Sequence, residues 1–116
     1  MNLLERINKS ADELPQIEVS IKQWGGKATV RRLSLSERSN MFELLSGENN
    51  NTNVATLLVA FSLVDEDGEK IHKKAPVMEI YKSLENGDHE VVDLLFEEAD
   101  KLSAITNKAV GKLEKN

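Results

Sequence analysis

Apolar and polar side chains alternate along residues 16–33, which is the period of a β-strand with one buried face. The alternation is interrupted at Gly25-Gly26, and two glycines readily adopt the positive φ angles of a two-residue primed turn. The pattern therefore predicts an antiparallel hairpin. Its register is expected to place Ile21 opposite Val30 on the apolar face.

Apolar side chains at three- and four-residue spacing predict helices on both sides of the hairpin. Residues 2–14 form a short amphipathic helix that stops at Pro15 and is expected either to dock on the body or to fray. A second helix begins at Ser34, which forms a capping box with Glu37. This helix is expected to end at Gly47 in a left-handed cap and to pack with the hairpin as one unit.

The second half of the chain is predicted to be helical with one extended interruption. The nearly continuous apolar run over residues 54–61 fits either a buried helix or a central strand. We favour a helix that enters an extended stretch near Leu63. Pro76 suits the first turn of the following helix, and Asp88 caps the next one. A last, looser helix is expected between residues 105 and 113.

These elements predict an α+β fold in which an N-terminal β-hairpin packs on a bundle of about four helices. A chain of 116 residues with 40% apolar and 30% charged side chains is typical of one globular unit. We therefore expect a single small domain over residues 1–116. Within it, residues 1–14 are expected as a mobile helix and residues 106–116 as a frayed tail.

Composition and charge narrow the classes of partner. The chain has no cysteine, which excludes a disulfide framework, a thiolate zinc site and a cysteine nucleophile, and a reducing compartment is expected. The N-terminus lacks the pattern of a signal peptide, and the apolar run at 53–64 is shorter than the about 20 residues that cross a bilayer. A net charge of −5 opposes binding to phosphate backbones. Neither a membrane nor a nucleic acid is the expected partner.

An acidic stretch at residues 65–69 directly follows the apolar run and is a candidate metal site. An EF-hand loop needs glycine at its sixth position and a bidentate glutamate at its twelfth. A loop that starts at Asp65 places Lys70 and Pro76 at these positions, and the register that aligns Gly68 ends the loop at a lysine. Calcium binding is therefore not expected. We interpret the stretch as a turn in which the glycine is left-handed and aspartate bonds to its own backbone.

No other residue pattern predicts catalysis or cofactor binding. The two histidines, His72 and His89, lie in different segments without metal-ligand spacing, and both are expected to be solvated. Adjacent carboxylates such as Glu97 and Glu98 point in different directions on a helix. No glycine-rich phosphate motif occurs. The sequence predicts no catalytic residue, no cofactor and no metal, and the chain is not expected to be an enzyme.

The only tryptophan, Trp24, lies beside the hairpin turn on the polar face. One interpretation is that the indole packs over lysine stems or a neighbouring helix. The other is an exposed anchor for a partner, because tryptophan is enriched among interface hot spots. Trp24, Arg31 and Arg32 are the candidate partner-binding residues.

The order of these motifs resembles the small tail assembly chaperones of long-tailed, siphovirus-like bacteriophages. The matching stretches are residues 30–38, "VRRLSLSER", residues 57–71, which end in "SLVDEDGEKI", and residues 94–106, which contain "LFEEADKLSAIT". They correspond to the family's strand leading into a helix start, its aliphatic run before an Asp-x-x-Gly turn, and its late helix. Ile71 and His72 stand where many members carry an aromatic residue.

The resemblance implies a non-enzymatic protein that binds its partners transiently. Members of the family bind the long tape measure protein and help recruit tail tube subunits during tail morphogenesis, and they are absent from the mature virion. The cytoplasm of the bacterial host is then the expected location. The alternative is a non-enzymatic phage structural or regulatory binding protein. Self-association is compatible with either function.

The family also suggests a hypothesis about the C-terminus. In many members a longer second product arises by a translational frameshift, when the ribosome slips back by one nucleotide near the end of the shorter reading frame. The final residues, Glu114, Lys115 and Asn116, permit codons for such a slip. An ordinary solvated charged tail is the simpler interpretation of the same residues.

Overall fold

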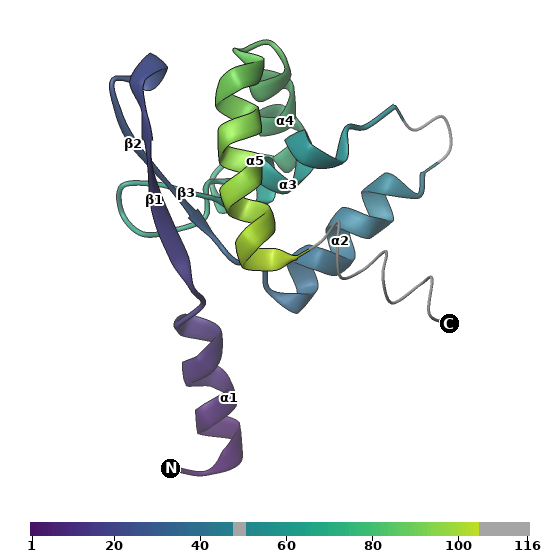
Figure 1. Cartoon of the computed structure of the whole chain (residues 1–116). Helices are drawn as coiled ribbons and strands as arrows, with labels where there is room; N and C mark the ends of the chain where they lie inside the picture. Colours follow the sequence, from purple (N-terminus) through teal and green to yellow (C-terminus); the bar gives the residue numbers. More distant parts are fainter. Residues whose placement is uncertain (48–50, 105–116) are drawn as a thin grey trace.

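The computed structural model describes residues 1–47 and 51–104 of the chain, and within this part a three-stranded antiparallel sheet is combined with five α-helices (Figure 1). The elements are α1 (Leu3–Asp12), β1 (Gln16–Ile21), the 3₁₀ turn η1 (Lys22–Trp24), β2 (Gly26–Arg31), α2 (Leu35–Leu45), α3 (Val54–Ser62), β3 (Leu63–Val64), the 3₁₀ turn η2 (Ile71–Lys73), α4 (Val77–Glu85) and α5 (His89–Ser103). The α+β class and the N-terminal hairpin are confirmed.

The hairpin has a different turn and register from those predicted. Val30 pairs with Ile17, and Ile21 pairs with Gly26, so the expected pairing of Ile21 with Val30 is wrong. The reason is the turn. Residues 22–24 form η1, and Gly25 closes it in the left-handed conformation at φ 70°, so the connection is longer than two glycines. Because the register shifts by an even number of residues, the apolar side chains still share one face.

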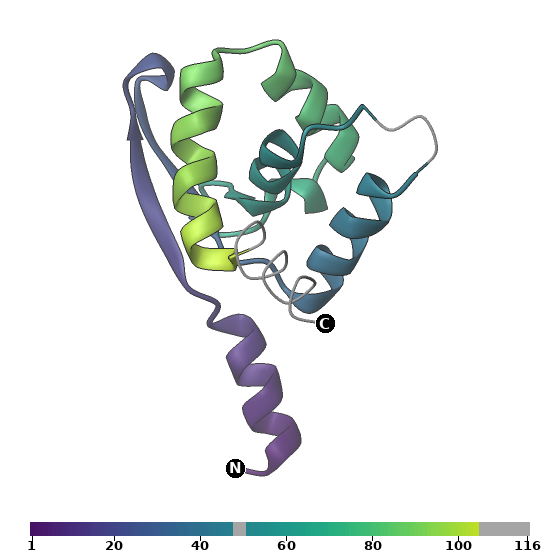
Figure 2. The same ribbon diagram turned by 45° about the vertical axis from the view of Figure 1, so that its right-hand side comes forward.

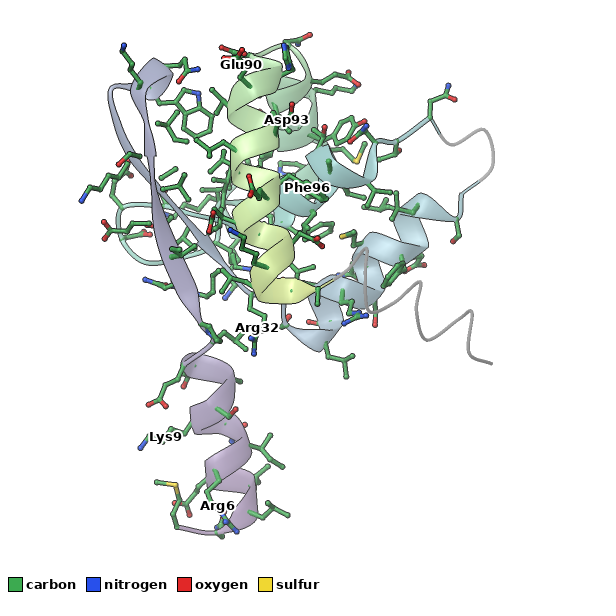
Figure 3. All side chains as sticks on the ribbon, viewed as in Figure 1. Arg6, Lys9, Arg32, Glu90, Asp93 and Phe96 are labelled. Atoms are coloured by element: carbon green, nitrogen blue, oxygen red, sulfur yellow. The ribbon has the colours of Figure 1, made fainter. Side chains whose placement is uncertain are left out.

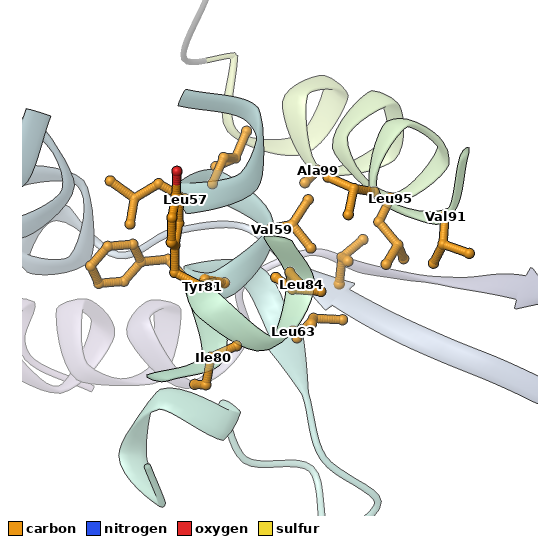
Figure 4. Packing of buried hydrophobic residues seen from close by; sticks show 14 of the residues in the cluster. Leu57, Val59, Leu63, Ile80, Tyr81, Leu84, Val91, Leu95 and Ala99 are labelled. Atoms are coloured by element: carbon orange, nitrogen blue, oxygen red, sulfur yellow. The ribbon is translucent and has the colours of Figure 1, made fainter. Parts of the chain in front are cut away.

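Helix α3 lies at the centre of the fold, between α4, α5 and the sheet. Its last six residues, 57–62, are all buried, which explains the unbroken apolar run, because a helix covered on every side has no solvent face. Figure 4 shows Leu57 of α3 near Tyr81 of α4, and Val59 of α3 near Leu84 of α4 on the side toward α5. The predicted helix over this run, and its exit into an extended stretch at Leu63, are both confirmed.

The apolar face of the hairpin is covered by α5 and α3. Val91, Leu95 and Ala99 are buried along α5, which runs beside both strands (Figure 1). Helix α2 instead makes its main contact with α3. The expectation that the hairpin and α2 form one packed unit is therefore wrong, because an element about 60 residues later in the sequence covers the hairpin.

Local signals at the helix ends are confirmed with one exception. Ser34 and Glu37 form the predicted capping box, and Asp88 caps α5 by accepting the Glu90 backbone N–H. The expected left-handed cap at Gly47 is wrong, because only Gly25 and Gly68 have positive φ among the described glycines. Ser46 closes α2 instead, donating its backbone N–H to Phe42 and its hydroxyl to Glu43.

Helix α1 projects from the body as a separate arm, and two views agree on this (Figures 1 and 2). It is a complete helix, with Asn2 accepting the Glu5 N–H at its start, yet none of its residues is buried. It therefore does not dock on its own body. The expectation that residues 1–14 are mobile stays a prediction. In the described residues no helix is long and apolar enough to cross a bilayer. The looser helix, the frayed tail and the slip site expected after Ala104 lie outside the described residues.

Candidate partner-binding groove

A groove of about 490 Å³ opens between the hairpin turn, β3 and α4. It is lined by Trp24, Lys27, Ala28, Leu63, Val64, Asp65, Glu66, Ile71, Ala75, Glu79, Ile80, Ser83 and Leu84, and we call it the Trp24 groove. Its floor is apolar, because Leu63, Ile80 and Leu84 belong to the buried core. A groove with an apolar floor and a few polar side chains at its edge is typical of a binding site.

Trp24 is the aromatic residue of this groove. Half of its surface remains accessible (50%), while the rest faces the groove wall. The short turn η1 holds the residue at this place, and the left-handed Gly25 that follows returns the chain into β2. The indole is thus partly packed and partly exposed, which combines the two interpretations of the sequence. A half-exposed tryptophan at an apolar groove is a plausible hot spot for a protein partner.

The edge of the groove carries more carboxylates than cations. Asp65, Glu66 and Glu79 line it together with a single lysine, Lys27, and Asp65 is already paired with Lys74. The ammonium of Lys27 lies 3.5 Å from a carboxylate oxygen of Glu18, and both side chains are more than 60% exposed, so this pair contributes little stability. The groove therefore favours an apolar segment with basic side chains along its margin.

The acidic stretch is a turn braced by a lysine. Gly68 adopts φ +85°, and Asp67 accepts the Glu69 backbone N–H, as the turn interpretation predicts. Lys74 donates to the carboxylates of both Asp65 and Asp67. The hydrogen bond from Lys74 is the main cause that lowers the pKa of Asp67, and the two carboxylates raise the pKa of Lys74. The Lys74 ammonium therefore occupies the position beside the two carboxylates that a bound metal ion would need.

We expect no stoichiometric calcium binding in the micromolar range, because Lys74 already pairs with both aspartates and the loop lacks a closing glutamate. Within the described residues no cluster of three or more His, Asp or Glu side chains could hold a metal ion. Isothermal titration calorimetry of the full chain with calcium tests this. A one-to-one site that disappears in Asp67→Asn would contradict the turn interpretation.

A buried cluster of Glu37, Lys70 and His72 ties α2 to the segment after β3. Lys70 is 4% exposed and donates to both carboxylate oxygens of Glu37 at 3.0 and 3.1 Å, and also to the Phe61 carbonyl at 2.9 Å. His72 bonds to the same carboxylate, and its ring packs edge-on against Phe61. The prediction that His72 is solvated is therefore wrong, whereas His89, with 84% of its side chain exposed, is solvated as expected.

The charges of this cluster depend on one another. Burial alone would raise the pKa of Glu37, but the Ser34 backbone N–H, His72 and Lys70 outweigh it and hold that pKa below its ordinary value. Burial lowers the pKa of Lys70, and Glu37 offsets only part of this effect. All buried polar side-chain atoms of the described residues have hydrogen-bond partners. The cluster is thus a satisfied structural clamp rather than a site open to a substrate.

The structure separates the three residues predicted to bind a partner. Arg31 and Arg32 lie at the end of the hairpin opposite Trp24 (Figure 3, where Arg32 is labelled). Arg31 donates to the Gln16 side chain and to the Gly68 carbonyl, and Arg32 donates to the Leu102 carbonyl at 2.6 Å. Both guanidinium groups therefore hold the fold together, and Trp24 alone of the three faces the groove.

The groove could be found only in part from the sequence. The position of Trp24 beside the hairpin turn indicates a candidate partner-binding residue. Leu63 and Ile80 give no such signal, because each belongs to an apolar stripe that fits core packing equally well. Comparison of the chain with protein-family models, with curated proteins and with solved structures finds no match. The fold and the groove define the class of the chain as an α+β domain with a candidate protein-binding surface.

Proposed function

We propose that the chain is a tail assembly chaperone of a long-tailed bacteriophage, which binds the tape measure protein and helps recruit tail tube subunits. It acts in the host cytoplasm and leaves before the virion is complete. The observation that carries the proposal is the half-exposed Trp24 at an apolar groove, joined to the sequence resemblance. The tape measure protein is a long, largely helical client in the resembled family. An amphipathic helix with basic margins fits a groove edged by Glu66 and Glu79.

The alternative is a non-enzymatic structural or regulatory binding protein of a phage, which would use the same groove. Mass spectrometry of purified virions separates the two functions. A chaperone is absent from the mature particle, whereas a structural component is present in stoichiometric amounts. The position of the gene gives an independent check, because a chaperone gene is expected between the major tail protein gene and the tape measure gene.

Replacing Trp24 by alanine is expected to weaken binding to the co-expressed tape measure protein by about 2 kcal/mol, or roughly 30-fold in Kd, because a hot-spot aromatic is lost. The matched control is Phe42→Ala. Phe42 is also a half-exposed aromatic (40%), but it lies on α2 and does not line the groove.

Affinity pull-down followed by surface plasmon resonance measures both variants, and thermal melts confirm that each remains folded. Equal Kd values for Trp24→Ala and the unmodified chain would exclude the groove as the contact surface. No complex with any tape measure protein encoded beside the gene would exclude the function.

A further inference from the structure

Helix α1 carries an apolar stripe that nothing in its own chain covers. Leu3, Leu4 and Ile7 are 65%, 66% and 56% exposed, and they share one side of the helix by their spacing. Isolated helices shorter than about 12–15 residues are marginal in water, and α1 has ten residues. A stable α1 therefore needs an apolar surface against which to pack.

This surface is not the Trp24 groove of the same copy. The connection after α1 is fixed to the sheet, because the Arg32 backbone N–H donates to the Pro15 carbonyl at 2.9 Å. Strand β1 starts there and reaches the groove only at its far end, six residues or about 20 Å away. Helix α1 moreover runs away from the hairpin rather than back along it (Figures 1 and 2).

The groove and the helix are complementary in chemistry. The groove has an apolar floor and is lined by three carboxylates, Asp65, Glu66 and Glu79, against one lysine. The stripe of α1 is apolar, and Arg6, three residues after Leu3, is a neighbour of the stripe on the helix surface (Figure 3 labels Arg6). The arginine of one copy would thus approach the carboxylates of another.

The size of the contact favours an exchange between two copies. A standard interface uses about 20–30 residues on each side, and one α1 stripe pressed on another would supply only a few. In a two-fold exchange, the α1 stripe of each copy instead meets the whole groove of the other copy. Each of the two helices then occupies one of the two grooves, so no helix or groove is left to bind a third copy.

We propose that the chain forms a two-fold dimer in which α1 of each copy docks in the Trp24 groove of the other through Leu3, Leu4 and Ile7. This inference concerns the chain alone and does not depend on the proposed function, and a client that binds the Trp24 groove would displace α1 from it. Because α1 buries no residue within one copy, the dimer is expected to dissociate without loss of the fold when the stripe is made polar.

Cysteine cross-linking tests the contact directly, because the chain has no native cysteine. Ile7→Cys and Ser83→Cys are made in separate full-length chains of different tag mass, mixed and oxidised. Ser83 is exposed and lines the groove. The expected product is a heterodimer of the two chains. Ser39→Cys, exposed on α2 outside the groove, is the matched control and should give at least tenfold less product with Ile7→Cys.

Each other product overturns the proposal in a recognisable way. A predominant Ile7→Cys homodimer would mean that α1 pairs with α1. A cross-linked monomer of the double variant would mean that α1 folds back on its own groove. In sedimentation equilibrium the unmodified chain should have twice the 13.0 kDa chain mass, and Ile7→Asp should have the chain mass while it still unfolds in one cooperative transition, at a lower midpoint than the dimer. A monomer for the unmodified chain up to about 100 μM would also contradict the exchange.

Discussion

Replacing Ile21 by aspartate is expected to destabilise the chain severely. Ile21 is 1% exposed at the end of β1, and the substitution both removes its apolar burial and places an unpaired carboxylate in the core. A loss above about 4 kcal/mol is expected, which is a large part of the 5–15 kcal/mol of a typical domain. Far-ultraviolet circular dichroism during thermal and urea unfolding measures it.

The matched control is Ser20→Asp, the same change at the neighbouring residue of the same strand. Ser20 is exposed, so its variant is expected to unfold within about 0.5 kcal/mol of the unmodified chain. Similar melting curves for Ile21→Asp and Ser20→Asp would show that the hairpin does not belong to the core.

The second large effect is expected at the buried clamp. Lys70→Met leaves the Glu37 carboxylate buried with only His72 and the Ser34 N–H as partners, and breaking a buried ion pair in this way costs about 3–5 kcal/mol. The double variant Glu37→Gln/Lys70→Met is expected to recover part of this loss, because it no longer buries a carboxylate that has lost its ammonium partner. Urea unfolding of the single and double variants gives the coupling free energy.

Lys73→Met is the control for Lys70→Met, because Lys73 is an exposed lysine three residues later in the same segment. Its variant is expected to change the free energy of unfolding by less than about 0.5 kcal/mol. If Lys70→Met is as stable as Lys73→Met, the clamp does not hold α2 to the segment after β3.

Signals that act within a few residues could be interpreted correctly from the sequence. The capping box of Ser34 and Glu37 spans one helical turn, and the Asp-Gly turn at Gly68 depends on backbone conformations that few residues adopt. The helix over residues 54–61 was also predictable, although its apolar run fits a strand as well. Each of these predictions needed only local chemistry.

Features that depend on distant residues could not be predicted. Glu37 has a second role as the partner of Lys70, 33 residues away, and nothing near either residue indicates it. The hairpin register depends on which of two turns Gly25 closes, and a glycine pair permits both. The carbonyl partners of Arg31 and Arg32, at Gly68 and Leu102, are likewise distant in the sequence and could not be predicted.

The central claim is that the Trp24 groove binds a client protein. The fluorescence of the only tryptophan in the chain measures this binding most directly. Titration of the Ile7→Asp variant, whose groove is not occupied by α1, with the tape measure protein proposed as its client, or with a tryptophan-free helical segment of that protein, is followed by the intrinsic fluorescence of Trp24. Since half of the indole is now accessible to water, burial by the client is expected to shift the emission to shorter wavelength in a saturable manner. A complex that forms with no change in the emission of Trp24 would contradict the account.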